Sequence, residues 1–184
     1  MKDETRLISK AKKGDIPAFE MLISTHEKMV YNYCYRMAGN LHDAQDLTQE
    51  VFLKAYRSLG SFKGRSQFST WIYRIAYNTC IDNHRSKKPE DFGMSSMDDE
   101  ESHMQFSSKD DRPEDRLLTK ERQEIIQECI NQLRPEYRSA IILRDIQGHS
   151  YEEIAKILDI PLGTVKSHIS RGRTDLRKSL GPRI

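Results

Sequence analysis

Apolar residues recur at helical spacing through nearly all of the 184 residues, and no strand-like alternation persists. The pattern is broken once, by the stretch KKPEDFGMSSMDDEESHMQFSSKDDRPED from Lys87 to Asp115, which has no sustained apolar face. A segment rich in acidic residues and Ser is typical of a flexible linker. We therefore expect an all-α protein with two small helical domains, residues 1–88 and 116–184, joined by a flexible acidic linker at residues 89–115.

Charge is divided among these three segments unevenly. The net charge of the chain is only +2, but the segments carry +6, −8 and +4 in order. Two basic modules suggest a nucleic-acid partner, although solvated helix faces would give the same charge. An extended linker of this length reaches roughly 90–100 Å, against a relaxed span of about 30 Å. The two modules could therefore hold distant sites on one partner.

Several classes of protein are disfavoured by the sequence. No apolar run approaches the roughly 20 residues that span a bilayer, and the N-terminus lacks the apolar core of a signal peptide. Cys34, Cys80 and Cys129 are odd in number and form no CxxC pair, which argues against disulfides and a zinc site. No phosphate-binding loop or nucleophile–base constellation is evident. We expect a cytoplasmic protein without membrane insertion, metal, cofactor or catalytic residues.

The periodic segments predict the helices. In the first module we expect them at residues 7–15, 16–39, 42–59 and 68–85, with Pro17 in the first turn of the second. In the second module we expect helices at residues 115–133 and 135–148, followed by a closely spaced pair after Ser150.

The pair after Ser150 has the pattern of a helix-turn-helix. Ser150 and Glu153 are spaced as a capping box, PLGT breaks the helix, and Thr164 suits the N-cap of the next one. Such a motif can place its basic second helix in the DNA major groove. The alternative is a helical hairpin with a solvated basic face. The buried side of the second helix is expected to comprise Val165, Ile169, Gly172 and Leu176, and the outer side Lys166, Ser167, Ser170, Arg171, Arg173, Thr174, Arg177 and Lys178.

The segment DAQDLTQEVFLKAYRSL combines an inward apolar stripe with an acidic outer face. An acidic patch beside an outward Leu suits a basic protein surface with an apolar centre. A solvated face is the alternative, and a metal site is disfavoured because no His joins the carboxylates at ligand spacing. The stripe comprises Ala44, Leu47, Val51, Ala55 and Leu59, and the outer face Asp46, Gln49, Glu50, Leu53 and Arg57.

The segment FSTWIYRIAYNTCIDNHR also divides into two sides. Aromatic and Arg planes stack on unpaired bases at about 1–3 kcal/mol per base. In the preceding loop, Lys63 and Arg65 could hold phosphates, and such a loop could cap a flipped base. Core positions are expected at Phe68, Trp71, Ile72, Ile75, Ala76 and Thr79; Tyr73, Tyr77 and His84 lie opposite, with Arg74, Asn78, Ile81 and Arg85 on one flank.

The motifs together resemble bacterial RNA polymerase sigma factors. IPLGTVKSHISRGR is similar to the helix-turn-helix of sigma domain 4 in the extracytoplasmic-function (ECF) group of the sigma-70 family. YRMAGNLHDAQDLTQEVFLKAYRSL is similar to the polymerase-binding part of sigma domain 2. The resemblance implies an alternative sigma factor that binds core RNA polymerase, directs it to promoters and promotes DNA opening, without catalysis of its own. A stand-alone helix-turn-helix regulator and an enzyme are the alternatives.

The resemblance also implies roles for individual residues. Asp46, Gln49, Glu50 and Leu53 would bind polymerase. Thr164, Lys166, Ser167, Ser170, Arg171 and Arg173 would read the duplex −35 element. Lys63, Arg65, Phe68, Tyr77, Asn78 and Arg85 would read and melt the −10 element as single-stranded DNA, and Trp71 could be structural or base-facing. An anti-sigma protein is a further expected partner of this family.

Overall fold

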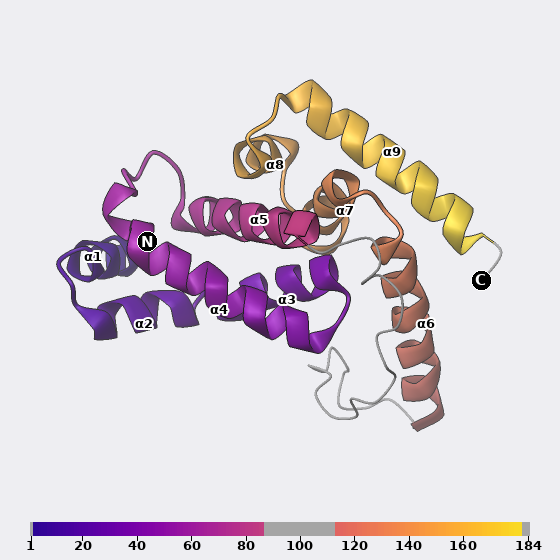
Figure 1. The fold of residues 1–184 in the computed structure, drawn as a ribbon, viewed down its shortest axis with the longest axis horizontal. Helices are drawn as coiled ribbons and strands as arrows, with labels where there is room; N and C mark the ends of the chain where they lie inside the picture. The colour runs from indigo at the N-terminus through magenta and orange to yellow at the C-terminus, as the bar shows by residue number, and fades with distance from the viewer. Residues whose placement is uncertain (1, 87–112, 182–184) are drawn as a thin grey trace.

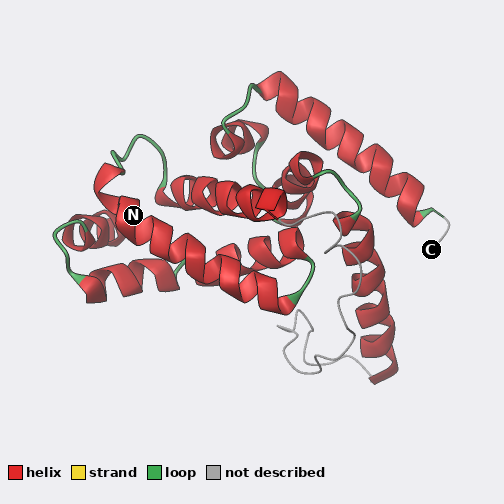
Figure 2. Cartoon of the chain, in the orientation of Figure 1, coloured by secondary structure: helices red, strands yellow, loops and turns green. Residues whose placement is uncertain are grey.

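The computed structural model describes residues 2–86 and 113–181, and every regular element within them is helical, as expected (Figure 2). The expected linker lies outside the described residues except at its end, where a helix begins at Pro113. The α-helices are α1 (Lys2–Ala11), α2 (Ile16–Ser24), α3 (Glu27–Ala38), α4 (Leu41–Ser58), α5 (Phe68–Ser86), α6 (Pro113–Asn131), α7 (Pro135–Ile141), α8 (Tyr151–Leu158) and α9 (Leu162–Leu180). Two short elements, η1 (Leu59–Ser61) and the π-helical η3 (Ile142–Ile146), follow α4 and α7.

Side-chain caps fix where several helices begin. Asp15 accepts a hydrogen bond from the backbone N–H of Ala18 at the start of α2, and Asn40 caps α4 in the same way. The capping box at α8 is confirmed: Ser150 and Glu153 satisfy each other's backbone N–H groups. This bond to a backbone donor lowers the pKa of the Glu153 carboxyl. The start of the helix-turn-helix is therefore held by local polar contacts.

Several predicted boundaries are wrong. The first helix, expected at 7–15, is α1 and spans Lys2–Ala11. The helix expected at 135–148 is α7 followed by the π-helical η3, which ends at Ile146. The expected helix at 16–39 is two helices, because Ser24 and Thr25 turn their hydroxyls back onto the carbonyls of Met21 and Leu22 and end α2.

The start of α9 also differs from the prediction. Thr164 is not its N-cap, since α9 begins at Leu162 and Pro161 holds the cap position. The backbone N–H of Thr164 instead donates to the Pro161 carbonyl within the first turn. Thr164 is half-buried there rather than leading the helix.

The first module packs α3, α4 and α5 against one another, with α1 and α2 at one end (Figure 1). The predicted inward stripe of α4 is confirmed, because all five of its residues are buried. The rings of Phe62, Phe68 and Trp71 form a cluster with centroids 5.2–5.7 Å apart, which joins the loop before α5 to the core.

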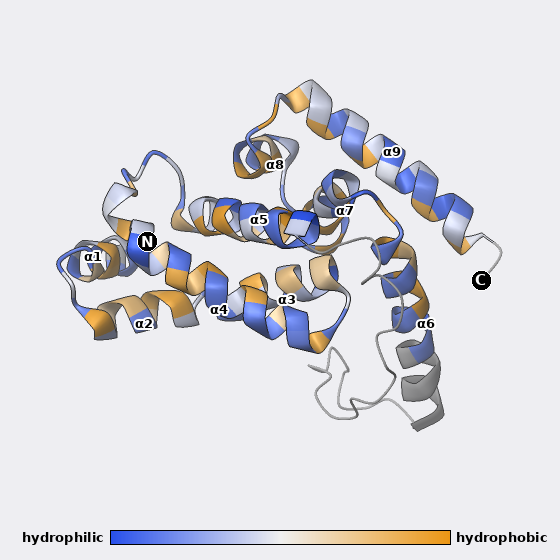
Figure 3. Ribbon diagram, viewed as in Figure 1, coloured by the Kyte–Doolittle hydropathy of each residue, from blue (hydrophilic) through white to orange (hydrophobic). Residues whose placement is uncertain are grey.

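The second module lies directly against the first. Helix α8 packs on α5, as does His149 in the loop before it, while α6 and α7 pack on α3. One contiguous cluster of buried apolar side chains runs through both modules. In Figure 1, α5 lies between the helices of the first module and α8, and α9 lies outermost. Figure 3 shows that α9 is largely hydrophilic.

Helix α9 packs on α7 through its predicted inner side. Val165, Ile169 and Gly172 are buried, and Leu176 is half-buried. A Cβ added at Gly172 would lie 2.7 Å from Cγ1 of Ile141. Glycine at this position therefore allows the two helices to approach closely.

Replacing Gly172 with Ala should lower the free energy of unfolding by about 1–3 kcal/mol, because the added methyl overpacks the contact with Ile141. Gly163 in the first turn of the same helix has open space around it, so Gly163→Ala is the matched control and should be neutral or stabilising. Urea unfolding of both variants measures the difference. Equal stability of the two variants would contradict this packing.

Candidate functional site

The outer face of α4 is exposed as expected. Asp46, Gln49, Glu50 and Leu53 all lie on the surface, and 56% of the Leu53 side chain is accessible. Asp46 pairs with His42 at 3.3 Å and Glu50 with Lys54 at 2.8 Å, each one helical turn away. These exposed pairs are worth little and are easily exchanged for a partner's charges.

Sequence reasoning missed one residue on this face. Tyr56 follows Leu53 by three positions on α4, and 43% of it is exposed. Its ring packs against Phe19 of α2 with centroids 5.0 Å apart. The i, i+3 spacing from Leu53 could have revealed it. Together the two side chains provide the apolar centre that a protein interface needs.

The outer side of α9 carries the basic residues of the helix-turn-helix. Lys166, Ser170, Arg171 and Arg173 are exposed, while Ser167 is half-buried. Arg173 forms a two-point contact with Asp145 of η3 at 3.0 and 2.5 Å. Arg171 donates to the Tyr137 hydroxyl at 3.2 Å, which raises the pKa of its guanidinium.

These contacts separate the predicted DNA-binding residues of α9 into fixed and free side chains. The Asp145 carboxylate holds the guanidinium of Arg173 in one orientation. Lys166 and Ser170 extend from the same side of α9 without a contact between elements in the described structure. The arrangement gives a basic helical surface of the width that a major groove admits.

The α5 surface only partly matches expectation. Asn78 and Arg85 are exposed, and Tyr77 and His84 are half-buried. Tyr73 is a correction: it was expected to face solvent but is 1% exposed. Its ring packs edge-on against His149 of the second module, with centroids 5.0 Å apart. Burial between the modules raises its pKa far above the ordinary value.

Tyr77 is covered from the same direction. Burial is the main cause of the raised pKa of its phenol, and the Glu136 carboxylate of α7 contributes. The side of α5 that periodicity placed away from its own core is therefore the side that the second module covers. Asn78 and Arg85, on the flank, remain accessible.

Phe68 was expected at a core position from periodicity and at a base from the resemblance. The core position is confirmed, because the side chain is 1% exposed and contacts Phe62, Trp71 and His26. In this arrangement Phe68 is a packing residue. Lys63 and Arg65, in the loop just before it, are exposed as expected, and Gly64 between them has φ 68°. Such a backbone suits glycine and turns the loop sharply.

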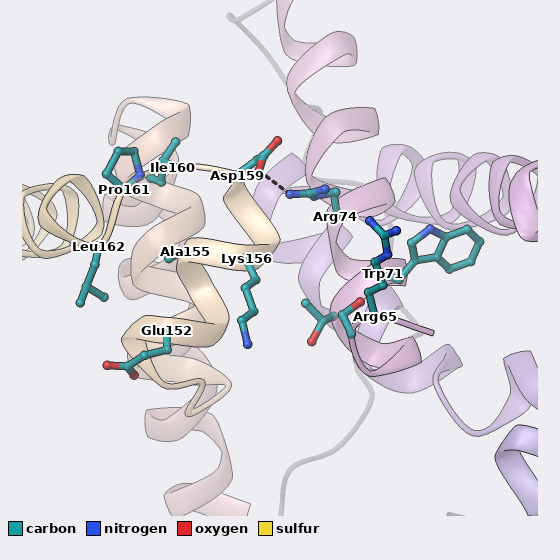
Figure 4. Close-up of a pocket in the computed structure, with 12 residues that line it drawn as sticks. Arg65, Trp71, Arg74, Glu152, Ala155, Lys156, Asp159, Ile160, Pro161 and Leu162 are labelled. Carbon is teal, nitrogen blue, oxygen red and sulfur yellow. Dashed lines mark ion pairs between the residues drawn. The ribbon is translucent and has the colours of Figure 1, made fainter. Parts of the chain in front are cut away.

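A cavity of about 670 Å³ lies where α5 faces α8 (Figure 4). Trp71, Arg74 and Arg65 line it from the first module, and Lys156, Asp159, Ile160 and Leu162 are among its residues from the second. Figure 4 shows Arg74 paired with Asp159, at 2.5 Å. Trp71 is half-buried and is among the residues that line this space, while its ring packs against Phe62 and Phe68.

The described residues hold no group of three or more His, Cys, Asp or Glu side chains placed to bind a metal ion. Among the described helices, none is long and apolar enough to cross a bilayer. The site is thus a set of surfaces: an acidic and apolar face on α4, a basic face on α9 and a polar flank on α5.

Comparison with known proteins shows which family the chain resembles. The sequence matches Sigma-70 region 2 over residues 22–90 and Sigma-70, region 4 over residues 123–176. It is 42% identical over 176 residues to the ECF RNA polymerase sigma factor SigW of Bacillus subtilis, covering 94% of each chain. It is 37% identical over 181 residues to the ECF RNA polymerase sigma-E factor of Escherichia coli, covering 97% of this chain and 94% of that one.

Two solved structures share the fold. CnrH, in complex with the cytosolic domain of CnrY, superposes with a TM-score of 0.71 at 21% identity, covering 99% of both chains. The sigma factor RpoE of Bartonella quintana, in complex with the anti-sigma factor NepR, superposes with a TM-score of 0.67 at 25% identity, covering 90% of this chain and 98% of that one. With two sigma regions in order and these identities over nearly its whole length, the chain belongs to the ECF RNA polymerase sigma factors.

Proposed function

We propose that the chain is an alternative sigma factor that binds core RNA polymerase through α4, docks on the −35 element through α9 and opens the −10 element with α5. The observation that carries this proposal is the separation of three exposed faces of different chemistry on two modules. A stand-alone DNA-binding regulator needs the basic face of α9 but has no use for the acidic face of α4. The chain would supply binding, and the polymerase the catalysis, in the cytoplasm.

Contact with polymerase is assigned to Asp46, Gln49, Glu50 and Leu53, with Tyr56 added. The four predicted residues are exposed on one side of α4, and the opposite side of the same helix is buried. A rigid helix thus presents carboxylates around an apolar centre, which favours a basic protein surface with its own apolar residues.

Promoter contacts are assigned to both modules. Lys166, Ser167, Ser170 and Arg171 would approach duplex bases and phosphates, with Arg173 held at the edge by Asp145. Thr164 lies in the first turn, where helix N-termini meet phosphates. For the −10 element the accessible candidates are Asn78, Arg85, Lys63 and Arg65, with Tyr77 half-covered. We assign Phe68 to packing.

The domain limits are assigned as residues 1–88, 89–115 and 116–184, with α6 extending into the linker as far as Pro113. The matches to region 2 and region 4 support this division. An anti-sigma partner is assigned by analogy with the Bartonella quintana protein, which was solved in complex with one. Transcription in vitro with purified core polymerase tests the whole proposal. Specific initiation should require this chain, and polymerase-independent tight promoter binding would favour the regulator.

Glu50→Lys should abolish co-purification with core polymerase, because it reverses the charge of a carboxylate beside the apolar centre of the α4 face and puts a second cation beside Lys54. Glu20→Lys, on the exposed surface of α2, is the control, since it makes the same change in net charge. Pull-down with tagged core polymerase measures the difference. Equal retention of both variants would refute the α4 interface.

Asn78→Ala should spare polymerase binding and impair promoter opening, because it removes an exposed amide that can hydrogen-bond an unpaired base. Loss of one such hydrogen bond, worth about 0.5–1.5 kcal/mol, should reduce opening by roughly 2- to 12-fold. Permanganate reactivity of unpaired thymines reports opening. Normal reactivity in the variant would remove Asn78 from the assignment.

A further inference from the structure

Buried polar contacts join the two modules. The hydroxyls of Tyr33 on α3 and Ser139 on α7 are hydrogen-bonded at 2.6 Å, and both side chains are fully buried. Arg36 of α3 donates to Gln127 of α6 at 2.9 Å, and Gln127 donates back to the Arg36 carbonyl. A buried polar group that loses its partner without gaining water carries a large penalty. The polar groups of Tyr33, Ser139, Arg36 and Gln127 form these hydrogen bonds only while the two modules are in contact.

Arg138 holds helix ends from both modules. Its guanidinium donates to the carbonyl of Met37, at the end of α3, and to those of Asn131 and Leu133, at and beyond the end of α6. The last carbonyls of a helix have no partner within it and carry partial negative charge. The Arg138 side chain is only 3% exposed, and burial lowers its pKa. One cation thus caps two helices that belong to different modules.

The contact continues along α5. His149 packs edge-on against Tyr73, and Asp159 pairs with Arg74. Asp159 is the C-cap of α8 and has φ 57°, so the end of that helix is shaped to reach α5. Tyr73, and Tyr77 one turn further on, belong to the aromatic side of α5 that could otherwise handle unpaired bases, whereas Arg74 lies on its flank.

The dimensions of a promoter set a second condition. The −35 and −10 elements are separated by about 25 base pairs, on the order of 85 Å at roughly 3.4 Å each. A compact chain of this length has a radius of gyration of about 16 Å, hence a diameter near 40 Å. The closed arrangement cannot reach both elements at once, so the modules must separate for the chain to read them.

We propose that Ser139, His149 and Asp159 of the second module, with Tyr33, Tyr73 and Arg74 of the first, form an interdomain latch that holds the chain closed on its own and covers the aromatic side of α5 until a partner opens it. That closure hides a DNA-contacting surface on α5 rests on the proposed function. The existence of the latch does not, because it follows from contacts within the chain.

The latch is tested with a triple variant of the second module, Ser139→Ala with His149→Ala and Asp159→Asn. Each substitution removes one contact to the first module and leaves the first module's sequence unchanged. Asn tolerates the left-handed backbone at position 159. Each lost contact lowers the closed-to-open ratio roughly two- to tenfold for the buried pairs and less for the exposed one. The ratio should fall roughly 10- to 100-fold.

Trp71 is a native reporter of opening, because it is the only Trp of the chain and is among the lining residues of the cavity that both modules form. In the triple variant its emission should shift to longer wavelength, acrylamide should quench it more strongly, and small-angle X-ray scattering should give a larger radius of gyration. Asp145→Asn is the control, since it breaks an ion pair within the second module. It should leave all three readouts unchanged.

Two results would overturn the latch. One is a wild-type protein that is already extended in solution, and the other is a triple variant that matches the wild type in scattering and quenching. Tyr33→Phe approaches the same contact from the first module and should open the chain in the same direction, which guards against a triple variant that fails to fold. Neither measurement uses polymerase or DNA, so an incorrect functional assignment would leave the outcome unaffected.

Two histidines at the contact should make closure pH-dependent. His149 faces Tyr73 of α5 and Glu153 of α8, and Arg144 donates to its backbone carbonyl. Burial lowers its pKa, and the Glu153 carboxylate opposes this in part. His84 of α5 faces α7: burial is again the first cause of its lowered pKa and the Arg138 cation the second, with the Glu136 carboxylate opposing.

A lowered imidazole pKa in the closed form means that closure is strongest above about pH 6.5, where both forms are neutral, and weakens as the pH falls below it. Acidification from about pH 7.5 to about pH 5.5 should therefore increase Trp71 quenching and the radius of gyration of the wild type. The double variant His84→Gln with His149→Gln should show a much smaller change. An equal change in both proteins would exclude the histidines as its source.

Discussion

The guanidinium of Arg138 is the interaction on which the arrangement of the chain depends. It lies where α3, α6 and α7 converge and supplies donors to carbonyls from two modules at once. Burying an arginine carries a large desolvation penalty unless its N–H groups form hydrogen bonds. Removal of the acceptor carbonyls would therefore leave a buried, uncompensated charge. The position of α7 relative to α3 is therefore set by polar geometry as well as by the shared apolar core.

Much of the fold could be predicted because it is local. The stripe on α4, the inner side of α9 and the capping box at Ser150 each depend on residues within a few turns of one another. The contact between modules could not be predicted in this way. Ser139 and Tyr33 are 106 positions apart, and each looks like an ordinary helical residue until the other is placed beside it. The burial of Tyr73 follows from the same long-range contact.

The candidate surfaces differ in how well sequence could locate them. The faces of α4 and α9 are set by helical periodicity alone, and the exposure of Glu50 and Lys166 follows from it. For Phe68, periodicity predicted a core position and the resemblance predicted a base contact; the ring packs in an aromatic cluster with Phe62 and Trp71, as periodicity predicted. The α5 surface has two proposed sets of neighbours: the second module when the chain is closed, and promoter DNA when it is open.

The covalent connection between α5 and α6 changes what strength the contact between modules requires. Ser86 and Pro113 are joined by 26 residues, so the two modules meet at an effective concentration on the order of millimolar. If the two modules, as separate proteins, bound each other with a dissociation constant about one tenth of this effective concentration, the linked modules would be paired some nine-tenths of the time. A partner that binds one module with nanomolar affinity would displace such pairing readily, so closure can be nearly complete and yet easily reversed.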